Sequence, residues 1–236
     1  MAAENPDWAA IILPALIGAI SGSLGGNIVT HWLKQREEKG KLRKELTEKY
    51  LLQLQYSIQA FHGRLYNKKE RGGGKYMNYI TGDDEYYKIS TLYSLGSILA
   101  LHRILLTEGV YSQMEYVYPK FGNLLLTKFD QFGYKLDSME IKNPETLKSV
   151  KFFRYDRMAL GDAVTETTNG TSRLLSYLKF KDMYKNDEKI NSTLERATEF
   201  TKNLPFSPEL EKLICDLRDL LDQLRQKTQI DTELRS

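Results

Sequence analysis

Cysteine is almost absent from this chain, whose 236 residues include only Cys215. One thiol excludes a framework of intramolecular disulfides, and it fits a reducing compartment. A large excess of charge is absent too, because 34 Lys and Arg residues stand against 31 Asp and Glu residues, a formal net charge of +3. Typical nucleic-acid-binding proteins are strongly basic, so nucleic acid is not an expected partner.

Familiar motifs for chemistry are also missing. The three histidines, His31, His62 and His102, lie far apart in the sequence, and none has the His-Glu-x-x-His spacing of a zinc site. No Gly-x-Ser-x-Gly nucleophile elbow occurs. The glycines at 72–74 before Lys75 lack the spacing of a phosphate-binding loop. The sequence therefore assigns no catalytic residue, and it predicts neither a cofactor site nor a metal site.

Acidic and basic residues are absent from positions 8–33. The stretch from Trp8 to Trp32 is 25 residues long, and about 20 residues suffice to cross a bilayer core of about 30 Å. The two tryptophans lie at its ends, as is common at membrane interfaces. Residues 1–33 contain no Lys or Arg, so the basic region of a cleaved signal peptide is missing. We therefore predict an uncleaved transmembrane helix at 8–33 after a short N-terminus at 1–7.

Basic residues follow this predicted span. Residues 34–49 hold seven Lys or Arg and four Glu, whereas Glu4 and Asp7 precede the span. Cytoplasmic flanks are enriched in Lys and Arg, so we expect a single-pass protein of the cell membrane with its N-terminus outside and its remaining chain in the cytoplasm. The same basic segment is expected to contact anionic lipid headgroups. The four residues nearest the span are Lys34, Arg36, Lys39 and Lys41.

Small residues line one face of the predicted span. Gly18, Gly22 and Gly26 recur every four residues, and residues four apart share a face of a helix. Such a face allows a second helix to approach closely, so we expect homo-oligomers through the membrane or packing on a partner's helix. The alternative is that these glycines reflect only the general abundance of glycine in membrane helices.

Apolar residues after the span recur with the period of helices that bury one face. This pattern predicts helices at 41–66, 86–106, 111–132 with an interruption near Pro119 and Gly122, 157–166, 171–180, 188–201 and 208–226. The 86–106 stretch is apolar on most sides, which is typical of a central helix, and a second membrane span is the alternative. Residues 150–155 are rich in β-formers, which predicts either a short strand, with residues 76–80 as its pairing candidate, or an extended entry into the helix at 157–166.

Leucines recur at alternating intervals of three and four along the last predicted helix, at Leu210, Leu213, Leu217, Leu220 and Leu224. This seam is about two heptads long, so packing within the domain is favoured and partner binding is the alternative. The predicted fold is mostly α: the transmembrane helix, a basic juxtamembrane helix at 34–49, a soluble multi-helix bundle at 50–226 with room for a minor two-strand element, and a polar tail at 227–236.

Two segments of the bundle carry a resemblance. The first is Thr91-Leu92-Tyr93-Ser94-Leu95-Gly96 with the following Leu101-His102-Arg103-Ile104, and the second runs from Phe152 to Asp162. Both resemble a pattern in uncharacterised bacterial helical proteins with one N-terminal span. The resemblance implies the same layout and brings no activity or site residue with it.

The leading interpretation is a non-enzymatic, membrane-tethered interaction or scaffold protein. Its expected partners are the lipid bilayer, a second copy of itself through the span, and a cytoplasmic protein. One alternative is a membrane-anchored enzyme with dispersed catalytic residues, which a polar pocket holding His62 or His102 beside carboxylates would favour. The other alternative is an oligomerising membrane effector.

Overall fold

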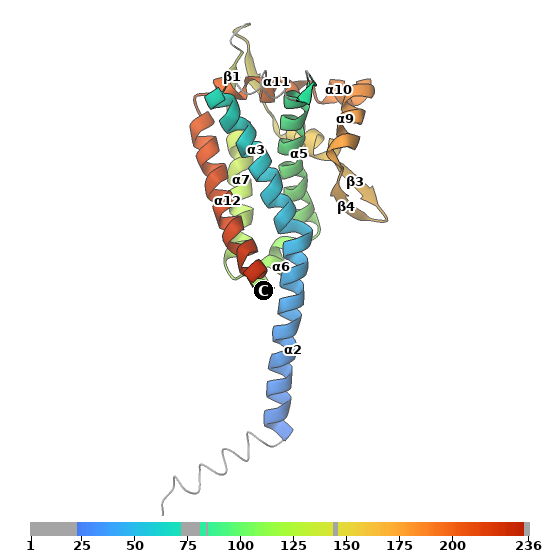
Figure 1. The fold of residues 1–236 in the computed structure, drawn as a ribbon, viewed down its shortest axis with the longest axis vertical. Helices are drawn as coiled ribbons and strands as arrows, with labels where there is room; N and C mark the ends of the chain where they lie inside the picture. The colour runs from blue at the N-terminus through green and yellow to red at the C-terminus, as the bar shows by residue number, and fades with distance from the viewer. Residues whose placement is uncertain (1–22, 72–80, 84, 144–145, 234–236) are drawn as a thin grey trace, which may run out of the picture. The chain divides into compact units, whose positions relative to one another are not determined.

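The computed structural model describes residues 23–71, 81–83, 85–143 and 146–233, whose helices and strands are shown in Figure 1. The described chain is mostly helical, which confirms the predicted fold class at that level. The chain divides into two compact units, Met1–Glu45 and Leu46–Ser236.

Helix α2 (Ser23–Leu46) makes up the described part of the first unit. It includes residues 23–33 of the predicted transmembrane helix, and Gly26 lies within it. Trp32 and Leu33 are both more than half exposed. The rest of the predicted span, with Gly18 and Gly22, lies outside the described residues, so the transmembrane helix stays a prediction.

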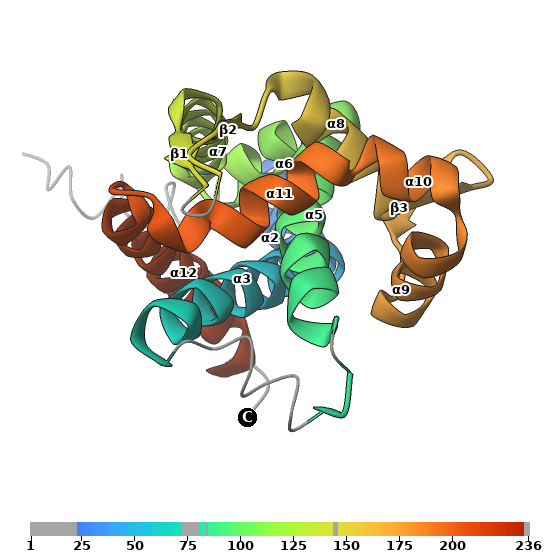
Figure 2. The same cartoon turned by 90° about the horizontal axis from the view of Figure 1, so that it is seen from above.

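The second unit is a helical bundle with two small sheets. Its helical elements are the π-helical turn η1 (Thr47–Leu51), α3 (Leu52–Arg71), α5 (Tyr86–Thr107), α6 (Val110–Val117), α7 (Phe121–Ser138), α8 (Arg154–Ala163), α9 (Tyr177–Asn186), α10 (Glu188–Thr193), α11 (Glu195–Asn203), the 3-10 turn η2 (Leu204–Phe206) and α12 (Leu210–Glu233). Helix α3 packs against α5 and α12, and α11 crosses the end of the bundle (Figures 1 and 2). The predicted interruption between 111 and 132 is confirmed between α6 and α7.

Helix α5 is the centre of this bundle. It contacts α3, α6, α8, α9 and α11, and Ile89, Leu92, Leu95 and Ile98 are completely buried in it. By length and composition, α5 is the one helix among the described residues that would suffice to cross a membrane, but 72% of its most apolar stretch is buried inside the protein. Contact with helices on several sides is a sufficient reason for its apolar character.

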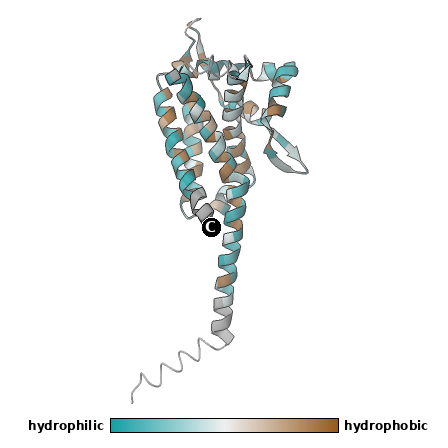
Figure 3. Ribbon diagram, in the orientation of Figure 1, coloured by the Kyte–Doolittle hydropathy of each residue, from teal (hydrophilic) through white to brown (hydrophobic). Residues whose placement is uncertain are grey.

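The leucine seam lies inside the bundle. Hydrophilic and hydrophobic residues alternate along α12 in Figure 3, as expected for a helix with one buried face. All five seam leucines are buried, with exposures of 4% or less. Packing within the domain is therefore confirmed, and the seam is not free for a partner. The helix begins two residues after Pro208, and the amide of Glu209 donates to the Ser207 hydroxyl before it.

The first sheet is a hairpin of two short strands. Strand β2 (Ser149–Lys151) pairs antiparallel with β1 (Glu140–Lys142), and Ile141 lies opposite Val150. The predicted strand at 150–155 is thus right at its first two residues, but its partner is β1. Residues 76–80, the partner predicted from the sequence, lie outside the described residues. A short hairpin is favoured because it closes a small loop.

The second sheet replaces parts of two predicted helices. Strands β3 (Thr165–Thr168) and β4 (Thr171–Leu174) form a hairpin whose turn residues, Asn169 and Gly170, have φ values of 52° and 77°. Positive φ at both positions is typical of a two-residue hairpin turn, and Asn-Gly is the pair that adopts it most readily. The prediction of helix through 166 and again from 171 is therefore wrong. Helix α9 begins only at Tyr177, after Ser176 accepts the amide of Lys179.

Candidate functional site

Helices α5 and α8 cross at two glycines. A Cβ added to Gly96 would lie 3.0 Å from a methyl carbon of Val164, and one added to Gly161 would lie 3.5 Å from the amide nitrogen of Ala100. A side chain at Gly96 would press on Val164 and Leu160, whereas a Cβ at Gly161 would make only ordinary van der Waals contact with α5. The two segments of the resemblance, 91–104 and 152–162, become neighbours in space.

A pocket of about 430 Å³ opens beside this crossing, and we name it the His102 pocket. It is lined by residues of α5, α7 and α8: Leu99, His102, Arg103, Leu106, Phe129, Asp130, Tyr134, Asp137, Arg154, Arg157, Met158 and Gly161. The volume is within the range of about 300–1,000 Å³ that is usual for binding pockets.

His102 is held in place by aromatic neighbours. Its Nδ1 is 2.7 Å from the hydroxyl of Tyr111, and its ring stacks on Phe129 with 5.1 Å between the centroids. The Nε2 atom is 3.9 Å from a carboxylate oxygen of Asp130, which is too long for a hydrogen bond. Burial lowers the pKa of His102, against the opposing effect of Asp130, so its imidazole is neutral at pH 7. Burial raises the pKa of Tyr111, so its hydroxyl stays protonated.

Arginines face carboxylates on the other side of the His102 pocket. Arg157 binds Asp137 with two hydrogen bonds, of 2.9 Å from Nε and 2.6 Å from Nη2. Arg103 forms an ion pair with Asp162. Arg154 has no ion pair with any residue that the structure describes, and its side chain is exposed. Two of the three arginines are thus neutralised within the protein, and the third is available to a partner.

The rim of the His102 pocket is apolar and aromatic. Leu106 is 56% exposed, Tyr134 is 74% exposed, and Met158 is 45% exposed. The lining residues include no Ser, Thr, Cys or Lys. The site can therefore hold an apolar group beside a charged one, and proton transfer through His102 is the chemistry that its residues permit.

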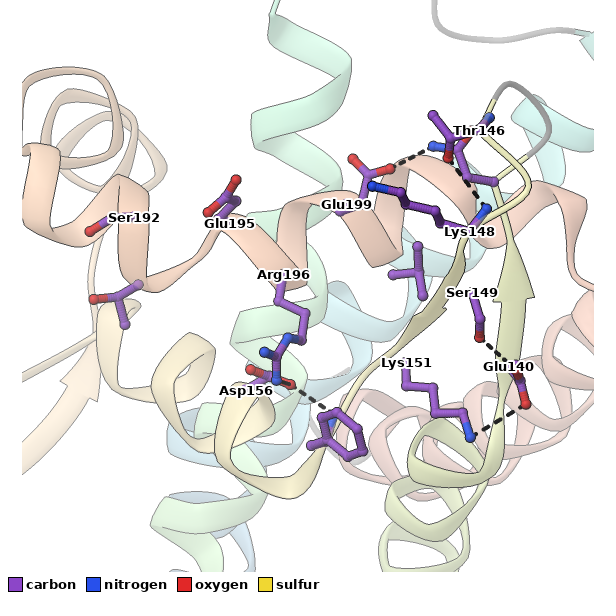
Figure 4. A pocket seen from close by; sticks show the side chains of 14 residues that line it. Glu140, Thr146, Lys148, Ser149, Lys151, Asp156, Ser192, Glu195, Arg196 and Glu199 are labelled. Atoms are coloured by element: carbon purple, nitrogen blue, oxygen red, sulfur yellow. Dashed lines mark hydrogen bonds and ion pairs between the residues drawn. The ribbon is translucent and has the colours of Figure 1, made fainter.

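A larger groove of about 920 Å³ lies between the β1–β2 hairpin and helices α10 and α11 (Figure 4). Several of its polar and charged side chains bind one another, as the dashed lines in Figure 4 show. Glu199 accepts a hydrogen bond of 2.8 Å from Asn143, and Glu140 accepts one of 2.6 Å from Ser149. Arg196 is 3.5 Å from Asp156. This mutual pairing makes the groove a weaker candidate than the His102 pocket.

His62 lies apart from His102, where α3 faces α12. Its ring stacks on Tyr66, and no hydrogen-bond partner of its Nε2 occurs among the described residues. Burial lowers the pKa of His62, and the nearby Arg218 and Arg225 lower it further. No group of three or more His, Cys, Asp or Glu residues in the described part of the chain is arranged to hold a metal ion.

The predicted lipid-contact residues lie on α2. Lys34, Arg36, Lys39 and Lys41 are all exposed. Lys41 pairs with Glu37 one turn earlier at 2.6 Å, and the Arg36 guanidinium lies over the ring of Trp32 at 5.4 Å. Their contact with lipid stays a prediction.

Comparison with protein families, with curated proteins and with solved structures finds no match to this chain. The resemblance carried by residues 91–104 and 152–162 therefore stays a prediction. The residues that meet in the His102 pocket come from three helices, and no spacing in the sequence indicates that Asp130 or Arg157 would join His102.

Proposed function

We propose that the protein is a membrane-tethered helical interaction protein. Residues 8–33 anchor it in the cell membrane with the N-terminus outside, and Gly18, Gly22 and Gly26 form a face for a second copy. The unit after Leu46 binds a cytoplasmic protein at the His102 pocket.

The observation that carries this proposal is the composition of the rim. Exposed Leu106, Tyr134 and Met158 surround a pocket that also presents the guanidinium of Arg154. Tyr, Met and Arg are enriched in protein interfaces, and binding energy concentrates where an anchor side chain fills a pocket. The partner that fits is a segment with an apolar side chain for the pocket and a nearby carboxylate for Arg154.

Site-specific photocrosslinking in cells tests the partner site. A photoreactive phenylalanine at position 134 is expected to give a discrete adduct, and Arg154→Glu is expected to reduce its yield at least several-fold. Tyr116 on α6 is 52% exposed and outside this pocket, so the same probe at position 116 is the matched control. Equal adducts at positions 134 and 116, or no effect of Arg154→Glu, would remove the His102 pocket from the proposal.

The single cysteine tests the topology. Cys215 on α12 is exposed, so a membrane-impermeant maleimide is expected to label it in inverted vesicles and not in intact cells. Labelling in intact cells would place the helical unit outside. Crosslinking of Gly22→Leu in membranes tests the glycine face, and an unchanged oligomer yield would exclude it.

A second candidate function, an acid–base site, is supported by the Tyr111–His102 hydrogen bond beside Asp130. A neutral imidazole that accepts at Nδ1 carries its proton on Nε2, facing Asp130. His102→Gln separates the candidates, because in an interaction protein any loss of the cellular phenotype comes with a parallel loss of the partner adduct. Loss of phenotype with an intact adduct would instead support the enzyme.

A further inference from the structure

A second pocket, lined by other residues than the His102 pocket, lies between α3, α5 and the segment formed by β4 and α9. Its volume is about 520 Å³, which again suits a small molecule. We name it the Arg64 pocket, because Arg64 is the one charged residue among its lining residues. No carboxylate lines it.

The guanidinium of Arg64 has hydrogen-bond donors that are not used within the described residues. Its Nε donates to the Ser90 hydroxyl at 3.0 Å, and its Nη1 donates to the carbonyl of Ala60 at 3.1 Å. No hydrogen bond of Nη2 and no ion pair of Arg64 occurs among the described residues. Arg157, which is also partly buried, is by contrast paired with a carboxylate. A partly buried guanidinium that is not paired with an anion can bind the carboxylate or phosphate group of a ligand.

Tyrosines form the wall opposite α3. The Tyr177 ring meets Tyr86 and Tyr93 edge to face, at centroid distances of 6.1 Å and 5.5 Å. The hydroxyl of Tyr93 is used, since it donates to the carbonyl of Leu175 at 2.7 Å. The hydroxyl of Tyr177 is buried and has no hydrogen-bond partner among the described residues. A bound group that reaches this hydroxyl therefore gains a hydrogen bond that the ligand-free protein lacks.

Serines of α5 provide acceptors along the same wall. The hydroxyls of Ser94 and Ser97 donate to backbone carbonyls of their own helix, at 2.9 Å and 2.8 Å. Their protons are therefore used, while their oxygen lone pairs can still accept. The pocket thus offers a cationic donor, a free hydroxyl, flat aromatic surfaces and hydroxyl acceptors.

We propose that the Arg64 pocket binds a small organic anion that carries a flat ring. The carboxylate or phosphate group binds Nη2 of Arg64 and the Tyr177 hydroxyl, the ring packs against the tyrosines, and ring N–H or O–H groups donate to Ser94 and Ser97. This site shares no lining residue with the His102 pocket, so it stands independently of the proposed protein partner.

The test is calorimetric titration of the full chain in lipid nanodiscs, with empty nanodiscs as the blank. Indole-3-acetate represents aromatic carboxylates and adenosine monophosphate represents aromatic phosphates; indole-3-acetamide and adenosine are the neutral counterparts. At least one anion is expected to bind saturably with one site per chain, and its neutral counterpart is expected to bind at least about tenfold more weakly. The anion that binds identifies the acidic group.

Two variants locate the site. Arg64→Met is expected to weaken anion binding at least about tenfold, whereas Arg154→Met, an arginine of the His102 pocket, leaves it unchanged. Tyr177→Phe keeps the ring and removes only the unpaired hydroxyl, so it weakens anion binding several-fold while the ligand-free protein keeps or gains thermal stability. Absence of binding by both anions, equal binding of the neutral counterparts, or wild-type affinity of Arg64→Met and Tyr177→Phe would each overturn the proposal.

Discussion

Gly122 lies where α6 and α7 come into backbone contact, and its replacement by alanine is the sharpest test of the packing. A Cβ there would be 2.7 Å from the amide nitrogen of Glu115 and closer still to the carbonyl oxygen of Tyr111. Both are backbone atoms and cannot turn away. The Glu115 carboxylate also accepts the amides of Lys120 at 2.6 Å and Asn123 at 3.0 Å, which ties α6 to the start of α7.

The expected cost follows from these distances. Ordinary contact begins near 3.4 Å, so the two helices must separate by roughly 0.7 Å at Glu115. Overpacking of this kind costs about 1–3 kcal/mol. Displacing Tyr111 also weakens its hydrogen bond to His102, which contributes about 1 kcal/mol. The higher helix propensity of alanine offsets up to about 1 kcal/mol of this cost. We expect Gly122→Ala to lower the free energy of unfolding by about 1–3 kcal/mol.

Urea unfolding of the full chain in detergent micelles, followed by the near-ultraviolet circular dichroism of its tyrosines, measures this change. With a slope of about 2 kcal/mol per molar urea, the midpoint falls by about 0.5–1.5 M. Gly161→Ala is the matched control, because its Cβ would stay 3.5 Å or more from its neighbours. It should keep or raise the midpoint. A midpoint for Gly122→Ala at or above that of Gly161→Ala would refute the packing described between α6 and α7.

Three further predictions concern charged groups. Arg157→Met removes the paired hydrogen bonds to Asp137 and should cost about 2 kcal/mol in urea unfolding; no loss would show that the pair is not stabilising. The hydrogen bond from Lys181 lowers the pKa of Asp83 from 3.8 to about 2, so the stability it contributes is present above pH 4 and is lost as the pH falls toward 2. Asp83→Asn should remove that part of the acid sensitivity, and an unchanged acid profile would contradict this. Burial lowers the pKa of His102 below its ordinary 6.5, so the unfolded chain binds the proton more readily and stability falls as the pH drops below 6.5. A titration of His102 by nuclear magnetic resonance should give a pKa below 6.5, and a higher value would rule out this environment.

Periodic patterns in the sequence predicted the long helices well. The leucines of α12 and the apolar residues of α5 repeat at helical spacing because each helix buries a continuous face, and that requirement is local. Boundaries are less predictable: the helix predicted to end at 132 continues as α7 to Ser138. The space that a side chain would need at Gly133 is filled by the guanidinium of Arg157, a reason that only packing reveals.

The β3–β4 hairpin was missed although its signal was present. Asn169-Gly170 after a threonine-rich run is a strong hairpin signal, and it outweighs the helical pattern on either side. The pairing of β2 with β1 was not predicted for a different reason. The strand at 140–142 is only three residues long and has a single apolar residue, Ile141, so its pairing depends on the short loop that joins it to β2.

From the sequence alone follow the single thiol, the uncharged stretch at 8–33 with its basic flank, and the helices whose apolar faces repeat locally. The tertiary structure decided which side chains meet. His102 meets Asp130 and Arg157 because α5, α7 and α8 pack together, and Arg64 meets Ser90 and Tyr177 because α3 and α9 flank the same side of α5. These contacts depend on which helices pack against one another. The apolar pattern of a single helix shows which of its faces is buried, and it does not show which helix covers that face.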